Sequence, residues 1–75
     1  MAINYAYYFA EIDNETNMCV GVLDTTNPDA EGPTLSGTTY VRIPVCDPEY
    51  CFKYYINGNW YEDAEGTIPW QSSML

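Results

Sequence analysis

Only a few kinds of side chain in this sequence could take part in acid–base or nucleophilic chemistry. They are the carboxylates, the hydroxyls, the amine of Lys53, and the thiols of Cys19, Cys46 and Cys51. The sequence has no histidine, which is the usual general base near neutral pH and the commonest metal ligand. A nucleophilic cysteine needs a neighbouring base or positive charge to lower its pKa, whereas acidic surroundings raise it. Glycine-rich phosphate loops and the G-x-S-x-G motif are also lacking. We therefore predict buried structural thiols and no enzymatic activity.

The cysteine spacing favours neither a disulfide framework nor a zinc site. Three is an odd number, which argues against a closed set of disulfides. Four residues separate Cys46 from Cys51, so a local bridge between them stays open, although we expect reduced thiols in a reducing compartment. Zinc held by cysteines alone takes paired, closely spaced ligands, and the single distant Cys19 leaves the set one ligand short.

The segment 13–24 has oxygen-bearing side chains at several ligand positions of a calcium-binding loop but lacks the other features of that loop. Positions 1, 3, 5 and 12 of the loop pattern are Asp13, Glu15, Asn17 and Asp24. The glycine expected at the sixth position is Met18, and the flanking segments have the composition of strands where the calcium loop has helices. Glu62, Asp63 and Glu65 also come close together, but consecutive residues of a strand point to opposite faces, so we read them as a solvated strand end. We predict no metal and no cofactor.

The charge balance limits the classes of partner. Eleven carboxylates stand against Arg42 and Lys53, which gives a formal net charge of −9. Nucleic-acid backbones and anionic membrane surfaces both attract basic side chains, so we expect neither as a partner. A solvated acidic surface is the favoured interpretation, with a basic protein partner or bound cations as alternatives. No apolar stretch approaches the roughly 20 residues of a transmembrane helix, and the first residues lack the features of a signal peptide.

The first segment, "INYAYYFAEI" at residues 3–12, has the alternation of a strand with two apolar faces. One face carries Tyr5, Tyr7 and Phe9, and the other carries Ala6, Tyr8, Ala10 and Ile12. The turn-forming residues 13–17, "DNETN", predict a five-residue loop, and "MCVGVLD" predicts the returning strand of a hairpin.

The middle of the chain is less regular. Residues 24–38 contain two prolines and two glycines, so we predict a surface loop with no regular element, either mobile or ordered by a partner. Residues 39–45, "TYVRIPV", predict a third strand that lies at an edge or ends at Pro44, which cannot donate to a ladder. In "CDPEYC", Asp47 and Pro48 fit the first two positions of a turn.

The strongest local signal is Asn57-Gly58, because a type I′ turn needs positive φ at both central positions. A two-residue loop here predicts a second hairpin with paired side chains across it. The predicted pairs are Ile56 with Asn59, Tyr55 with Trp60, Tyr54 with Tyr61, and Lys53 with Glu62. The turn and the side chains specify the same register, which indicates a folding scaffold.

These elements predict an all-β fold: a small antiparallel sheet of two hairpins and an edge strand, with an extended C-terminal tail. The β-domain spans residues 1–66, including the loop 24–38, and residues 67–75 form a tail that docks on this domain or on another chain. Aromatic and apolar side chains with a polar tip or an exposed position suit protein interfaces. The predicted protein-binding residues are Tyr5, Tyr7, Tyr55, Trp60, Ile68, Trp70, Met74 and Leu75.

The order of these motifs resembles small phage-encoded virion proteins, whose genes commonly lie near those for tail fibres and tail tips. The motifs are the opening "INYAYYFAEIDNETNMCVGV", the middle "YVRIPV", the late "KYYINGNWYED" and the ending "PWQ". The likeness covers both ends of the chain and thins out between residues 25 and 50. It implies an assembly component that is made in the host cytoplasm and resides in the virion, and it carries over no catalytic residue.

Two hypotheses follow from these observations. The first is a structural or accessory virion protein that binds other virion subunits of the tail, fibre or capsid, or further copies of itself, with no nucleic acid, membrane or small-molecule substrate. The alternative is an acidic inhibitor whose carboxylates imitate nucleic-acid charge and block a host defence enzyme or polymerase. The net charge of −9 motivates the alternative, although its acids lie mainly in turns and strand ends.

Overall fold

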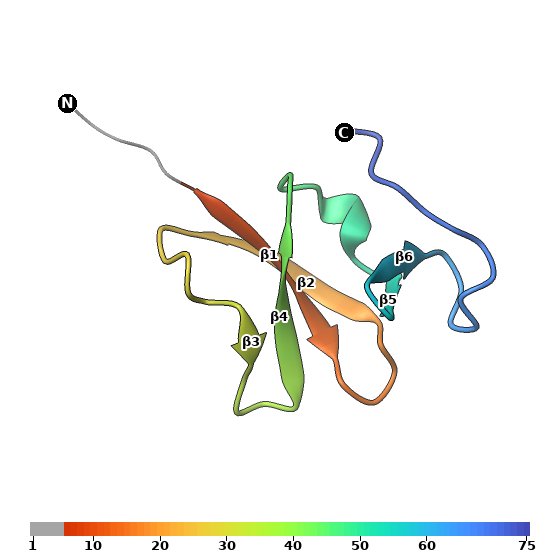
Figure 1. Ribbon diagram of the computed structural model, residues 1–75, viewed down its shortest axis with the longest axis horizontal. Coiled ribbons are helices and arrows are strands. Elements are labelled where there is room, and N and C mark those ends of the chain that lie inside the picture. Colours follow the sequence, from red (N-terminus) through yellow and green to blue (C-terminus); the bar gives the residue numbers. More distant parts are fainter. Residues whose placement is uncertain (1–5) are drawn as a thin grey trace.

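The computed structural model describes residues 6–75, and these form an all-β domain, as the sequence predicts (Figure 1). Four strands make an antiparallel sheet in the order β2-β1-β4-β3, and two more make a separate hairpin sheet, β5-β6. Among the described residues, no helix is long and apolar enough to cross a membrane. The elements are β1 (Tyr7–Asp13), β2 (Cys19–Thr25), β3 (Gly32–Pro33), β4 (Thr38–Ile43), the 3₁₀-helix η1 (Pro48–Tyr50), β5 (Tyr54–Ile56) and β6 (Asn59–Tyr61).

Strands β1 and β2 form the predicted first hairpin, with the turn shifted by one residue to 14–18. The Asp13 amide donates to the Met18 carbonyl at 2.9 Å, and Asn17 takes a positive φ of 65°. The pairing then breaks its register: Glu11 faces Gly21 while Ile12 faces Cys19, so Val20 is an extra residue in β2. This β-bulge leaves Val20 exposed and turns Cys19 into the core.

Strand β1 is covered on both faces, as its two apolar sides predict. Ala10 and Ile12 belong to the main core, where they pack with Cys19 and Ile43. Phe9 points to the opposite face and is fully buried, with Leu23 of β2 and Arg42 of β4 as its neighbours in register. Burying such a side chain contributes about 1.5–3 kcal/mol, so the second face adds materially to a small core.

The predicted third strand is β4, which pairs along its whole length with β1 and ends at Ile43, immediately before Pro44. The prediction that the segment 24–38 holds no regular element is wrong at its ends, where β2 runs to Thr25 and β4 begins at Thr38. It is also wrong for Gly32–Pro33, which pair with Thr39 and Tyr40 as β3. Gly32 has a φ of 125°, a conformation that glycine adopts without strain. Proline is tolerated in β3 because this strand is at the edge of the sheet.

The same segment is ordered by its own side chains. Three short turns form when a side-chain oxygen accepts from an amide two residues on, at Thr25, Asn27 and Thr34. The Thr34 and Thr38 hydroxyls lie 2.7 Å apart, and the Thr38 hydroxyl donates to a Glu11 carboxylate oxygen at 2.8 Å. The loop is therefore tied to β1 and β4 without a partner.

Strands β5 and β6 form the second hairpin in the predicted register, including the Lys53–Glu62 ion pair at 3.5 Å. Asn57 and Gly58 have φ values of 52° and 84°, as a type I′ turn requires. This hairpin is a sheet of its own, and main-chain bonds connect it to the first sheet: Tyr55 N donates to Asn17 O at 2.9 Å, and an isolated bridge joins Met18 to Tyr54.

We predict that Gly58→Ala lowers the free energy of unfolding by about 1–2 kcal/mol, because it forces a Cβ into the left-handed region. A Cβ at Gly58 would meet no atom within 4 Å, so the cost is conformational. The matched control is Gly21→Ala in β2, where φ is not positive and the new Cβ makes only an ordinary contact of 3.8 Å with Glu11. Urea unfolding measures both variants, and equal losses would contradict the proposed origin of the effect.

Candidate protein-binding surface

An aromatic cluster joins three parts of the chain that are distant in sequence. It consists of Tyr50 at the end of η1, Tyr55 and Trp60 on facing positions of the second hairpin, and Trp70 in the tail. The Tyr50 ring centroid lies 4.8 Å from that of Trp60 and 4.9 Å from that of Trp70, both in edge-to-face geometry. Such pairs add about 0.5–1.5 kcal/mol each beyond the area they bury. Tyr50 is 2% exposed and is the centre of the cluster.

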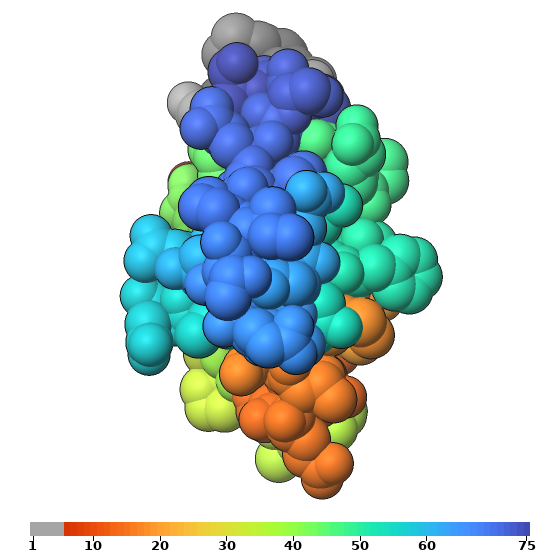
Figure 2. All heavy atoms as spheres, turned by 90° about the vertical axis from the view of Figure 1, so that its right-hand side faces the viewer, coloured from red at the N-terminus to blue at the C-terminus, as the bar shows by residue number. Residues whose placement is uncertain are grey.

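The tail docks on its own domain through the main chain as well as through Trp70. Residues 67–75 run over the second hairpin on the face shown in Figure 2. Glu62 N donates to Ile68 O at 2.8 Å, Trp70 N donates to Trp60 O at 3.0 Å, and an isolated bridge joins Tyr61 to Pro69. The tail thus acts as a short third strand beside β6.

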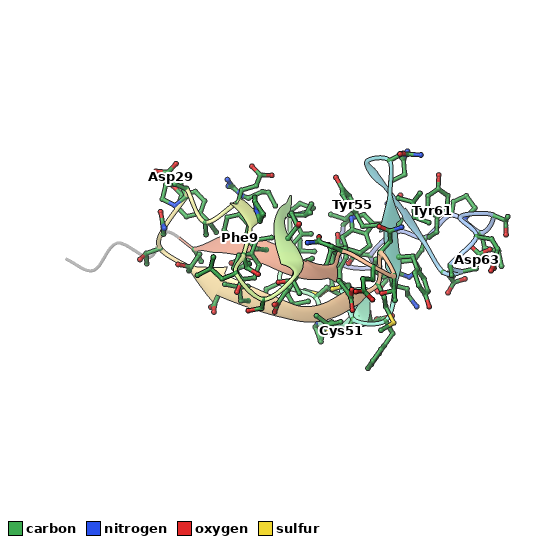
Figure 3. The ribbon with its side chains drawn as sticks, turned by 90° about the horizontal axis from the view of Figure 1, so that it is seen from below. Phe9, Asp29, Cys51, Tyr55, Tyr61 and Asp63 are labelled. Carbon is green, nitrogen blue, oxygen red and sulfur yellow. The ribbon has the colours of Figure 1, made fainter. Side chains whose placement is uncertain are left out.

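Asp63 forms the turn that brings the tail back. One of its carboxylate oxygens accepts from the amides of Thr67 and Ile68, each at 2.9 Å, and the other accepts from the Thr67 hydroxyl. These hydrogen bonds, the Thr67 side chain first, hold the pKa of Asp63 below its ordinary value of 3.8. Asp63 begins this turn, and Figure 3 shows it farther from the first sheet than Tyr61. The acid therefore has a structural role beyond that of a solvated strand end.

Further along, the tail is anchored by a buried polar pair. The Ser72 hydroxyl donates to a carboxylate oxygen of Asp47, and each residue is 2% exposed. The second Asp47 oxygen accepts from Glu49 N at 2.9 Å and caps η1. Sequence reasoning identified Asp47 only as a turn residue and missed Ser72. Nothing in the pattern "WQSSML" distinguishes Ser72 from Ser73.

The structure separates the predicted protein-binding residues into three groups. Tyr5 lies outside the described residues. Tyr55, Trp60 and Trp70 come together in the aromatic cluster and are half-buried there. Ile68, Met74 and Leu75 are exposed to 51%, 58% and 61%; we call these three side chains, which are spread along residues 68–75, the tail patch. Tyr7 stands apart from both groups, half-buried under the Arg42 guanidinium at 4.5 Å from its ring centroid.

Three exposed apolar side chains were missed: Val20, Leu35 and Phe52. Phe52 is 72% exposed and has a φ of 73°, a conformation that costs a bulky residue free energy. Its amide donates to the Cys19 carbonyl at 2.8 Å, and this bond holds the backbone there. The sequence offers no signal for this position, because an aromatic residue before "KYYI" has the composition of a strand residue.

Both cations of the chain are engaged within it. Arg42 stacks over Tyr7 and lies 6.0 Å from the Phe9 centroid. Lys53 pairs with Glu62 and lies 5.3 Å from the centroid of Trp70. With nearly all the carboxylates left without a cationic neighbour, the surface is strongly negative.

The cysteines match the expected buried thiols only in part. Cys19 is fully buried, whereas Cys51 is half-buried and Cys46 is exposed, and all three are free thiols. Burial raises the pKa of the Cys19 thiol to about 11. Within residues 6–75, no group of three or more cysteine, aspartate or glutamate side chains is placed to hold a metal ion.

A shallow hollow of about 400 Å³, open to solvent, lies where β1 begins and β4 ends. It is lined by Ala6, Tyr8, Arg42, Ile43 and Pro44. Comparison with protein-family models, curated protein sequences and solved structures finds no match to this chain.

We predict that Trp70→Ala lowers the free energy of unfolding by about 2–4 kcal/mol, because it empties one side of the aromatic cluster. Ile68→Ala is the control from the same tail, since Ile68 is exposed and its main-chain bond survives the change. Its cost should stay below about 1 kcal/mol. Chemical denaturation followed by far-UV circular dichroism measures the free energy of unfolding of both variants without relying on tryptophan fluorescence. If Trp70→Ala lowered this free energy as little as Ile68→Ala does, Trp70 would not be part of the core.

The turn at Asp63 predicts a pH dependence. Because the pKa of Asp63 is lower in the folded state, its contribution to stability is fully present above the ordinary pKa of 3.8 and is lost as the pH falls through the lowered folded value. Asp63→Asn should therefore flatten the decline in stability below about pH 4. Glu65→Gln, a change at an exposed residue of the same turn, should leave the decline unaltered. Thermal melts from pH 2 to 6 test this, and an unchanged decline in Asp63→Asn would contradict it.

Proposed function

We propose that this protein is a structural or accessory component of a phage virion that binds other virion subunits. The observation that carries the proposal is the tail patch: Ile68, Met74 and Leu75 remain exposed on a tail that is fastened to its own domain. Because the tail is already held in one conformation by its hydrogen bonds to the domain, a partner that binds its apolar side chains loses little free energy to the ordering of the tail.

The fold leaves only part of the predicted docking surface free for a partner. The aromatic residues that the sequence offers for docking are largely used inside the chain, at Tyr55, Trp60 and Trp70. What is left for a partner is the tail patch and the separate exposed side chains of Val20, Leu35 and Phe52. The resemblance of the opening and closing hairpins to small virion proteins supports the virion as the assembly concerned. Because the chain has a net charge of −9, a partner that contacts its surface carboxylates is expected to be basic there.

The proposal is tested with purified phage particles and the purified chain. Wild-type protein should co-sediment with the particles, whereas Met74→Ser combined with Leu75→Ser should reduce the bound fraction at least about tenfold, as loss of an apolar anchor does. Leu35→Ser is the matched control, because Leu35 is a fully exposed apolar residue that lies outside the tail. Circular dichroism checks that all variants fold. A wild-type chain that is strictly monomeric and never sediments with particles would overturn the proposal.

The acidic inhibitor remains the second candidate, favoured by one observation: of the eleven carboxylates, all in the described part of the chain, only Glu62 has a cationic side chain paired with it. Such an inhibitor would bind a basic nucleic-acid enzyme, and its affinity would fall steeply with added salt. The virion component binds mainly through apolar side chains, and its affinity would change little with salt. Titration of binding between low and high salt therefore separates the two functions.

A further inference from the structure

Two of the three cysteines meet where the second hairpin joins the first sheet. Cys19 is the first residue of β2 and Cys51 directly follows η1. The Cys19 amide donates to the Lys53 carbonyl at 2.8 Å, and the Phe52 amide donates to the Cys19 carbonyl at 2.8 Å. These two bonds fix the chain next to Cys51 against Cys19. Figure 3 labels Cys51 beside the sheet at this junction.

The two thiols are also neighbours through their side chains. Burial is the main cause of the raised pKa of the Cys19 thiol, and the neighbouring Cys51 thiol raises it further. The Cys19 sulfur itself donates to the Gly21 carbonyl at 3.2 Å, which fixes its orientation. Cys46 lies on the other side of η1 and is exposed. The pair that these main-chain bonds bring together is Cys19 and Cys51, which are far apart in the sequence.

We propose that Cys19 and Cys51 form a dithiol that closes to a disulfide in the folded protein when it meets a low-molecular-weight disulfide such as oxidised glutathione. In the first step the Cys51 thiolate attacks one sulfur of oxidised glutathione, and one glutathione thiolate leaves and takes up a proton. In the second step the Cys19 thiolate attacks the Cys51 sulfur, and the second glutathione leaves. The two cysteines lose two protons and two electrons in all, and oxidised glutathione is reduced to two glutathione molecules.

The order of these steps follows from exposure. Cys51 is half-buried and accessible to a small disulfide, whereas Cys19 is fully buried and receives only an intramolecular partner. A buried thiol with a high pKa reacts slowly with a disulfide in solution. The second step is nevertheless fast enough, because Cys19 attacks a disulfide held on the neighbouring Cys51 and the reaction is unimolecular. The bond would join β2 covalently to the segment before the second hairpin. The inference concerns the chain itself and does not depend on the proposed partner.

Digestion with trypsin distinguishes a bridge to Cys19 from a bridge between Cys46 and Cys51. Cleavage after Arg42 and Lys53 places Cys19 on one peptide and both other cysteines on a second peptide, residues 43–53. The folded full chain is incubated with oxidised glutathione, its free thiols are alkylated, and the digest is analysed by mass spectrometry without reduction. We expect the Cys19 peptide to be linked to peptide 43–53, with Cys46 alkylated. The Cys46→Ser variant should form the same link, and Cys51→Ser should form none.

Three results would overturn the inference: a bridge confined to peptide 43–53, a stable glutathione adduct on Cys51 with Cys19 left reduced, or a link that persists in Cys51→Ser. The melting temperature gives a second readout that does not rely on a variant. Closing a loop of this length in a native fold should raise it by roughly 10 °C or more relative to the reduced chain. An oxidised chain that melts no higher than the reduced one would show that the bond forms outside the native arrangement and would contradict the inference.

Discussion

The edge-to-face contacts around Tyr50 are the interaction on which the rest of this domain depends. A chain of this size buries only about 60% of its unfolded surface, so a single sheet of four strands cannot provide a core by itself. Tyr50 lies against the core face of that sheet, and Trp60 and Trp70 close over it from the second hairpin and the tail. Three local structures thereby share one hydrophobic core.

Main-chain hydrogen bonds set where that cluster forms. The segment 52–55 pairs with 17–19, at the turn end of the first hairpin. The buried Asp47–Ser72 pair holds the far end of the tail to the cap of η1. Because each fastening uses a different part of the chain, the tail is an integral part of the fold and its exposed apolar residues are held in place.

Local signals predicted the fold well where a turn and its flanking side chains specify the same geometry. The Asn57-Gly58 turn determined its own register, and Pro44 marked the end of β4. Interactions over long sequence distances were not predictable in this way. Pairing of Gly32–Pro33 with β4, burial of Ser72 and the meeting of Cys19 with Cys51 all depend on where separate elements pack. Of the candidate site, the sequence identified Tyr55, Trp60 and Trp70 but not Tyr50, the centre of the cluster. It also could not distinguish the aromatic and apolar residues that fill the core from those that stay exposed.

The single extra residue at Val20 has a consequence for how this chain tolerates insertions and deletions. Val22 faces the core, so strict alternation along β2 would point Cys19 to the opposite face; the bulge restores it to the side of Ile12. Removing one residue from β2 would reverse the direction of Cys19 and shift every main-chain bond that ties residues 17–19 to the second hairpin. Length variation among related chains should therefore collect at the tips of the surface turns, while the length of β2 stays constant.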